Sequence, residues 1–285
     1  YAEDARYYPL LLEHWRMVGD EEKELAYLVP VVQHLVWITG DHKKAHDLIH
    51  RGLALLPAVD RRRVALLNEQ ASSFWRQGQY DKAEASAQLV LSLAPQVGDP
   101  SSLALSLNTL GLVARIKGDF TGARDYCQQS LSICQTIGDH EGTAYALSNL
   151  GLVAQFQRDY VAAENFHQRS LAVSRTSGNQ RFIAVGLGNL GRLAQFHGEY
   201  AIAQGYYQQS LVVRQAIGEQ LGIASSLNRL GYIAQIQGND LAAHDYYQQS
   251  LVICQAIGDQ LGLAFTYSAL GTLYFEQEAY QQAID

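Results

Sequence analysis

Apolar residues recur along this chain with the period of an α-helix, and the whole pattern repeats every 40 residues. Residues 101–117 place apolar side chains three and four positions apart, at Leu103, Leu107, Leu110 and Ala114. Residues 120–136 carry a second such face, formed by Phe120, Ala123, Cys127, Leu131 and Cys134. No stretch alternates like a β-strand. Each unit therefore predicts two helices, called helix A and helix B below.

Glycine marks the end of each predicted helix. Gly118 follows helix A, and Gly138-Asp139 follows helix B, where glycine suits the left-handed C′ position and aspartate can cap the next helix. Equivalent breaks occur at Gly98-Asp99, Gly178-Asn179, Gly218-Glu219 and Gly258-Asp259, of which Glu219 is the weakest cap. The short turns predict that the two helices of a unit are antiparallel.

A second set of glycines stands inside helix A, where each costs about 1 kcal/mol relative to alanine. They follow a leucine at 40-residue intervals, at Gly111, Gly151, Gly191, Gly231 and Gly271. An alanine follows three residues later in four units, and another follows twelve residues later in all five. Because small residues let two helix backbones approach closely, these glycines are predicted to form the contact between helix A and helix B.

Repetition of one helix pair predicts an all-α protein, a right-handed α-solenoid (superhelix) of antiparallel helix pairs. Residues 61–285 would form the repeat array, with about five full 40-residue units and a truncated last one. Residues 1–60 keep the phase poorly and contain Pro30, which predicts a degenerate N-terminal segment of three or four helices. All tryptophans lie before residue 78, which indicates a different packing in this part of the chain.

The repeat resembles the tetratricopeptide repeat family in its longer, 40-residue form. The resemblance covers about residues 64–285 and is carried by Leu107-x-x-Leu110-Gly111-x-x-Ala114, Gly118-x-Phe120-x-x-Ala123 and Ser130-Leu131, with close copies in later units. Similar arrays occur in Pins/LGN adaptors, kinesin light chains and the sensor arms of STAND (MalT-like) signalling ATPases. Glu13-His14-Trp15 followed by Gly19-Asp20 is similar to the segment that joins the ATPase core to the repeats in STAND regulators. The resemblance implies an interaction scaffold rather than an enzyme.

The two ends of the sequence look like those of a fragment, because it begins with Tyr1 and stops at Asp285 within a predicted helix B. No polar capping helix follows the last unit. An apolar stripe with Leu270, Leu273 and Tyr280 is therefore expected to be incompletely covered. Exposed solenoid ends favour stacking, so we expect concentration-dependent self-association through the C-terminal end.

Charge and composition argue against several classes of function. The net charge of −7 disfavours a broad surface for nucleic acid or an anionic membrane. The sequence shows neither an apolar run long enough to span a bilayer nor a secretory signal. Cys127, Cys134 and Cys254 fall on apolar positions and are interpreted as buried thiols, which fits a reducing, cytoplasmic location.

Three histidines are the candidate metal ligands: His42, His46 and His50, at four-residue intervals on one predicted helix. Two histidines at i and i+4 can share a zinc ion. However, no other unit repeats the set, and His46 and His50 match outward or flanking positions. Phosphate-binding loops and nucleophile elbows are also missing from the sequence. We therefore predict no metal site, no cofactor and no catalytic residue.

The family resemblance implies that helix A lines a concave groove. The candidate ligand surface then consists of residues beside each Leu-Gly pair: Asn108, Leu112, Arg115, Tyr145, Asn149, Leu152, Gln155, Asn189, Arg192, Gln195, Asn228, Arg229, Tyr232 and Gln235. These residues vary between units whereas the framework repeats. Such variation is expected of a groove that selects one ligand, although neutral drift on a surface gives the same pattern.

The chemistry of this surface suits a peptide. Amide side chains can satisfy a peptide backbone, and Arg115, Arg192 and Arg229 can bind carboxylates. The leading hypothesis is a non-catalytic scaffold that binds a protein or peptide and serves as the sensor or interaction arm of a larger bacterial signalling protein. Two alternatives stay open: a superhelix that closes around a small-molecule effector, and a structural spacer or self-assembly module.

Overall fold

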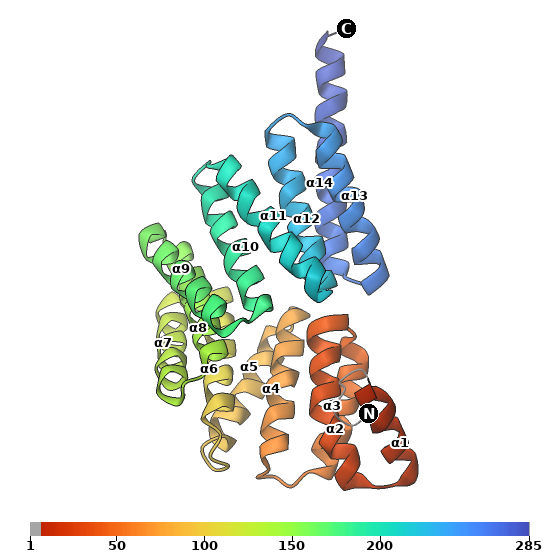
Figure 1. Ribbon diagram of the computed structural model, residues 1–285, viewed down its shortest axis with the longest axis vertical. Helices are drawn as coiled ribbons and strands as arrows, with labels where there is room; N and C mark the ends of the chain where they lie inside the picture. The colour runs from red at the N-terminus through yellow and green to blue at the C-terminus, as the bar shows by residue number, and fades with distance from the viewer. Residues whose placement is uncertain (1–6, 285) are drawn as a thin grey trace. The chain divides into compact units, whose positions relative to one another are not determined.

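The computed structural model describes residues 7–284 and the side chains of residues 7–275. This part of the chain contains fourteen α-helices and no β-strand (Figure 1). The all-α solenoid class predicted from the periodicity is confirmed. The helices are α1 (Tyr8–Val18), α2 (Glu21–His34), α3 (His42–Leu55), α4 (Arg61–Arg76), α5 (Tyr80–Leu93), α6 (Pro100–Ile116), α7 (Phe120–Ile137), α8 (His140–Phe156), α9 (Tyr160–Ser177), α10 (Gln180–Phe196), α11 (Tyr200–Ile217), α12 (Gln220–Ile236), α13 (Asp240–Ile257) and α14 (Gln260–Ile284).

The chain divides into two compact units, residues 1–169 and 170–285, which meet within α9. Each unit is described by itself below. The A helices of the repeats are α4, α6, α8, α10 and α12, and the B helices are α5, α7, α9, α11 and α13. By its sequence phase α14 is a further A helix. The boundary predicted between residues 60 and 61 stays a prediction.

Helix caps follow the predicted turns. Asp119, Asp139 and Asn239 each accept a hydrogen bond from a backbone N–H of the helix that follows. Glu219, the weakest predicted cap, makes no such bond. Its carboxylate lies instead 3.7 Å from a guanidinium nitrogen of Arg214 and 3.8 Å from one of Arg181. The longer side chain therefore serves an ion pair rather than a cap.

Four of the five helix-interior glycines are contact points between helices A and B, as the sequence predicted, whereas no described atom lies within 4 Å of a Cβ built on the fifth, Gly271. A Cβ atom built on Gly191 would lie 2.8 Å from the ring of Tyr207, and one on Gly231 would lie 2.6 Å from the ring of Tyr247. In the earlier repeats, Cys127 lies over Gly111 and His167 lies over Gly151. No side chain larger than hydrogen fits beneath these residues without moving them.

In the first repeat, two small residues form the corresponding contact between helix A and helix B. Ala71 replaces the glycine of α4, and Ala87 of α5 stands at the position that Tyr207 and Tyr247 occupy later. Both alanines are fully buried in one cluster with Leu110. The sizes of the two facing residues are therefore complementary: glycine faces a larger side chain, and alanine faces alanine.

Recurrent serines add a hydrogen bond to each of several helix contacts. The hydroxyls of Ser130, Ser210 and Ser250 donate to the carbonyls of Ala104, Ala184 and Ala224, at 2.8, 2.8 and 3.0 Å. The sequence indicated only that a small residue is needed at this position. The structure shows that serine also satisfies a backbone acceptor, which explains why alanine does not stand there.

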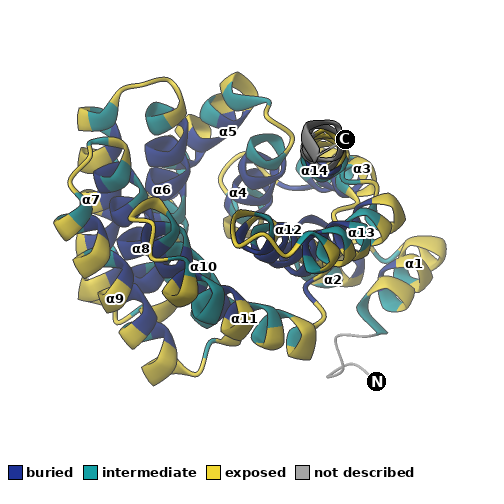
Figure 2. Ribbon diagram, turned by 90° about the horizontal axis from the view of Figure 1, so that it is seen from above, coloured by how far each residue is buried: buried dark blue, intermediate teal, exposed yellow. Residues whose placement is uncertain are grey.

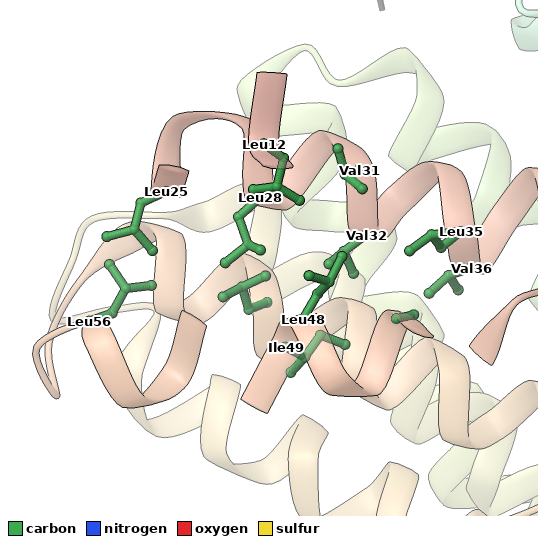
Figure 3. Packing of buried hydrophobic residues seen from close by; sticks show 12 residues of the cluster. Leu12, Leu25, Leu28, Val31, Val32, Leu35, Val36, Leu48, Ile49 and Leu56 are labelled. Carbon is green, nitrogen blue, oxygen red and sulfur yellow. The ribbon is translucent and has the colours of Figure 1, made fainter. Parts of the chain in front are cut away.

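The N-terminal helices form an apolar core of their own. Leu28, Val32 and Ile49 are almost fully buried between α2 and α3, and Figure 3 shows their neighbours from α1 to α3. The end of α2, which contains Pro30, continues as the π-helical segment η2 (Leu35–Thr39). Proline removes a backbone donor inside a helix, so this irregularity has a local cause.

The last helix departs from the prediction. A helix B was expected to follow a turn near residue 278, but α14 continues to Ile284. Residue 278 is glutamate where Gly118, Gly198 and Gly238 adopt positive φ. Arg158 takes this conformation with φ 62°, at a cost of about 1 kcal/mol.

The expected exposure of the C-terminal stripe is also wrong for two residues. Leu270 and Leu273 are 5% and 0% exposed, because they pack against Ala243 and Tyr247 of α13. Tyr280 lies outside the residues whose side chains are described. The exposed apolar side chains of α14 lie on its other sides and include Leu261, Phe265 and Phe275.

Candidate functional site

Direct contacts between A helices occur in both units. Consecutive A helices contact one another where α4 meets α6, α6 meets α8, and α12 meets α14. Successive B helices within a unit make no comparable contact in the described residues. That the candidate residues of the A helices line a concave groove stays a prediction. Figure 2 shows the buried positions concentrated along α6 and α8 and the exposed ones along α7 and α9.

Three of the predicted asparagines are buried and hold neighbouring helices together. The amide of Asn149 donates to the side-chain oxygen of Asn108 over 3.4 Å, which links α8 to α6. Asn228 of α12 and Thr266 of α14 are hydrogen-bonded over 3.0 Å. These asparagines are 6% exposed or less, as is Leu112. Their side chains are committed to the array, so we leave them out of the ligand surface proposed below.

Two predicted glutamines position the tyrosines that lie over the helix glycines. The hydroxyl of Tyr207 donates to Gln195 over 2.8 Å, and that of Tyr247 donates to Gln235 over 3.1 Å. Burial raises the pKa of Tyr207 to about 12, although Arg229 and Arg192 act in the opposite direction. The two arginines therefore lie within electrostatic reach of one buried hydroxyl, on neighbouring A helices.

The remaining predicted residues are at least partly exposed. They are Arg115, Tyr145, Leu152, Gln155, Asn189, Arg192, Gln195, Arg229, Tyr232 and Gln235. Arg192 donates to Asn189 over 3.4 Å, whereas Arg229 forms neither a hydrogen bond nor an ion pair with any described residue. Tyr232 is 41% exposed. A guanidinium, an aromatic ring and amides are thus accessible together on α10 and α12.

The first unit also contains a partly exposed arginine on an A helix, Arg115 of α6. Its guanidinium carbon lies 4.8 Å from the centre of the Phe156 ring, which also stacks on Phe120. Burial lowers the pKa of Arg115, and its Nε is buried without a hydrogen-bond partner. No described carboxylate pairs with it, so this guanidinium retains capacity for an anion.

Sequence reasoning missed an exposed apolar residue at the end of each of four A helices, α6, α8, α10 and α12. Ile116 and Phe156 belong to the first unit, and Phe196 and Ile236 belong to the second. They are between 40% and 66% exposed. Each stands five residues after a helix glycine, a spacing that could have revealed them. Phe156 is the one whose ring lies against Arg115.

The histidines predicted to face outward do not all do so. His42 and His46 both turn toward the buried hydroxyl of Ser73 on α4, at 3.0 and 3.1 Å, and only His50 is exposed. The described residues contain no group of three or more His, Cys, Asp or Glu side chains arranged to hold a metal ion. The histidine pair therefore acts as a polar contact between α3 and α4.

This histidine pair predicts a pH dependence of stability. Burial lowers the pKa of both imidazoles below their ordinary 6.5, aided by the charges of Arg76 on His42 and of Lys82 on His46. Because the pKa is lower in the folded protein, the unfolded chain binds more protons once the pH falls below about 6.5. The contribution of the two imidazoles to the free energy of unfolding is therefore fully present above that pH and is lost as the pH falls below it. Each imidazole changes the free energy of unfolding by at most about 1.4 kcal/mol per pH unit.

Urea unfolding followed by tryptophan fluorescence measures this effect, because all tryptophans lie in the first 75 residues. The free energy of unfolding is expected to fall between about pH 7.5 and pH 5.5, and to fall less in the variant with both His42→Gln and His46→Gln. Equal pH slopes in the variant and the parent protein would show that other groups cause the dependence.

None of the helices in the described residues combines the length and hydropathy needed to cross a membrane. The three cysteines are free and buried. Burial raises the pKa of Cys127 to about 12 and that of Cys134 to about 11. These thiols are therefore poor nucleophiles and act as packing residues.

Comparison with known families assigns the repeats. The sequence model of the tetratricopeptide repeat matches residues 102–176, 182–256 and 222–285, and a second model with the same description matches residues 66–101. These matches cover most of the chain from α4 onward. A search of curated proteins found no match.

Solved structures with related folds share little sequence with this chain. A Rap protein complexed with Competence and Sporulation Factor has a TM-score of 0.72 at 13% identity, over 98% of this chain and 88% of that one. The APC/C hetero-tetramer Cut9–Hcn1 has a TM-score of 0.65 at 17% identity, over 94% and 47% of the two chains. A STAND protein with a tetratricopeptide repeat sensor from Pyrococcus horikoshii has a TM-score of 0.60 at 14% identity, over 94% and 44%. These similarities show the fold alone.

Proposed function

The chain belongs to the tetratricopeptide repeat family, and we propose that it is a non-catalytic scaffold that binds an acidic protein or peptide segment on its A helices. The observation that carries this proposal is a local excess of positive charge. Although the chain has a net charge of −7, α10 and α12 contain three arginines and neither aspartate nor glutamate. The arginines are Arg181, which pairs with Glu219 at the start of α12, and Arg192 and Arg229.

The exposed chemistry of these helices suits an extended segment with carboxylate and apolar side chains. Arg229 has no anionic partner in the described residues and can pair with a carboxylate. Tyr232, Phe196 and Ile236 supply apolar contacts beside it. Gln195 keeps its amide nitrogen available after its oxygen accepts from Tyr207. Affinity would thus come from charge-assisted hydrogen bonds flanked by apolar anchors.

A peptide selection tests this proposal and does not require the natural partner. Short random peptides displayed on phage are selected on the immobilised protein, and the affinity of each enriched peptide is then measured by calorimetry. We expect enriched peptides to contain aspartate or glutamate next to an aromatic or aliphatic residue. Arg229→Gln and Tyr232→Ala should each weaken binding by about tenfold or more, since a hydrogen bond to a charged group contributes roughly 1.5–3 kcal/mol.

Two surface variants serve as controls. Arg175→Gln removes an exposed arginine of α9, and Val252→Ala shortens a side chain of α13 that is 63% exposed. Both should bind the peptides as the parent protein does, and all four variants should keep the parent melting temperature. Peptides that bind Arg229→Gln and Tyr232→Ala with unchanged affinity would contradict the proposal.

We further propose that the scaffold is the sensor arm of a larger bacterial signalling protein of the STAND type, in a reducing cytoplasm. The support is the shared fold with the repeat sensor of a STAND protein and the buried, unoxidised cysteines. The complete reading frame of the gene tests this idea. A nucleotide-binding core upstream of residue 1 is expected, and a reading frame without one would contradict it.

A further inference from the structure

Arg115 of α6 is partly buried, yet its guanidinium makes neither a hydrogen bond nor an ion pair with any described residue. Other partly buried arginines of the first unit use their donors within the protein. Arg51 bonds to both carboxylate oxygens of Glu24, and Arg63 donates to two backbone carbonyls. Because a guanidinium has five N–H donors and burying them without an acceptor costs free energy, the donors of Arg115 are available to a bound group.

The guanidinium of Arg115 is accessible along one edge. Its Nε is buried without a hydrogen-bond partner, whereas its Nη1 and Nη2 are not buried. One face of the group lies against the ring of Phe156, with 4.8 Å between the guanidinium carbon and the ring centre. Stacking on a ring uses none of the N–H donors, which point outward in the plane of the guanidinium. The edge with the two Nη atoms therefore remains open to a bidentate contact.

Apolar side chains surround this edge. Phe156 is 54% exposed, and Ile116, which follows Arg115 in α6, is 43% exposed. Burial lowers the pKa of Arg115, and the side chains that oppose this shift are Cys127 and two tyrosines, all of which are uncharged at neutral pH. An anion bound here would thus meet one cation and an apolar surface.

The charge of the site matches a monoanion. Lys117, the next basic residue along the chain, already pairs with Asp81 and Glu84 at 2.8 and 2.7 Å. A doubly charged phosphate would therefore keep one charge unpaired at this position. We propose that Arg115 and Phe156 form a binding site for a carboxylate that carries an apolar group. The site belongs to the first unit and does not depend on the acidic segment proposed for α10 and α12.

Arginine side-chain NMR with benzoate tests the site. Because Nε of Arg115 is buried, its proton exchanges slowly with water, and its Nε–Hε cross-peak is identified as the one that Arg115→Met lacks. Benzoate should shift this cross-peak in a saturable way, with a dissociation constant on the order of 1–10 mM. Acetate, which lacks the apolar group, and inorganic phosphate at the same ionic strength should each bind at least about threefold more weakly.

Thermal unfolding of Arg115→Met gives an independent result. Removing a guanidinium without a partner should leave the melting temperature unchanged or raise it, whereas Arg51→Met should lower it because Glu24 loses its cation. Benzoate should raise the melting temperature of the parent protein and not that of Arg115→Met. The matched control is Arg175→Gln, which removes an exposed arginine of α9 and should respond to benzoate as the parent protein does.

A further variant separates this site from the one proposed on α12. Arg229→Gln should leave the benzoate response of Arg115 unchanged, whether or not it weakens the binding of acidic peptides. The selected peptides also distinguish the source of the carboxylate: a peptide that shifts the Arg115 cross-peak indicates a polypeptide ligand, and a shift with benzoate alone indicates a free organic acid.

Three results would overturn the proposal. The first is an Arg115 cross-peak that benzoate does not move. The second is tighter binding of phosphate than of benzoate. The third is an Arg115→Met variant that melts as low as Arg51→Met, because that loss would reveal a partner of Arg115 within the chain.

Discussion

Replacing Arg51, whose side chain is 36% exposed, by methionine is expected to lower the free energy of unfolding of the N-terminal helices by about 2–3 kcal/mol. Arg51 of α3 donates through Nε and Nη2 to both carboxylate oxygens of Glu24 on α2, the second over 2.7 Å. The side chain of Glu24 is only 2% exposed. Without Arg51, this carboxylate would remain buried without its cation, which costs more than the pair itself contributes.

Urea unfolding monitored by tryptophan fluorescence reports this loss, since Trp15 lies in α1 and Trp37 in η2, the segments that precede and follow α2. The matched control is Lys117→Met, which removes a lysine that pairs with Asp81 and Glu84 at 2.8 and 2.7 Å. These groups are exposed enough that the change should cost about 1 kcal/mol or less. If Arg51→Met is no more destabilising than Lys117→Met, the buried pair does not hold α2 and α3 together.

Replacing Gly231 by alanine is expected to lower the free energy of unfolding of the second unit by about 1–3 kcal/mol, although alanine is the better helix former. The added Cβ would lie 2.6 Å from the ring of Tyr247. That ring is 1% exposed and its hydroxyl is bonded to Gln235, so it has no space to move away. The overlap should outweigh the gain in helix propensity.

Two glycines of the same unit provide controls. Gly205 in α11 and Gly271 in α14 have no atom within 4 Å of a Cβ position among the described residues. Alanine at either position should raise stability by about 0.5–1 kcal/mol.

The double variant Gly231→Ala with Tyr247→Ala recreates the Ala71–Ala87 pair of the first repeat. Its free energy of unfolding should be higher than the sum of the losses in the two single variants predicts. Stabilisation by Gly231→Ala, measured by thermal and urea unfolding, would contradict the packing role of the glycine.

The sequence was sufficient to predict the elements that repetition specifies. Five glycines at one phase, each followed by small residues at fixed offsets, indicated the contact between helices A and B. The turn glycines and the capping aspartates likewise predicted where the helices end. Each of these features depends on one local requirement, such as a left-handed φ or a close backbone approach, that few residue types can meet.

Features that depend on distant partners were missed. Asn108 and Asn149 look like groove residues in the sequence, but they bond to each other across two helices 41 positions apart. His46 occupies an outward phase, yet it turns toward Ser73 because the N-terminal helices pack on α4 differently from a regular repeat. The continuation of α14 past residue 278 was missed because glutamate at this position indicates neither a turn nor a continuing helix by itself. The positions of the asparagine and histidine side chains are thus determined by partners on other helices, which the sequence does not reveal.

Photo-crosslinking tests the central claim, that the A helices rather than the B helices bind the partner. Benzoylphenylalanine is placed either at Tyr232 of α12 or at Val252 of α13, both of which are exposed. Each protein is then irradiated with a selected acidic peptide. We predict that the peptide crosslinks from position 232 and not from position 252. Crosslinking from position 252 alone would show that the partner binds the outer helices and would contradict the account.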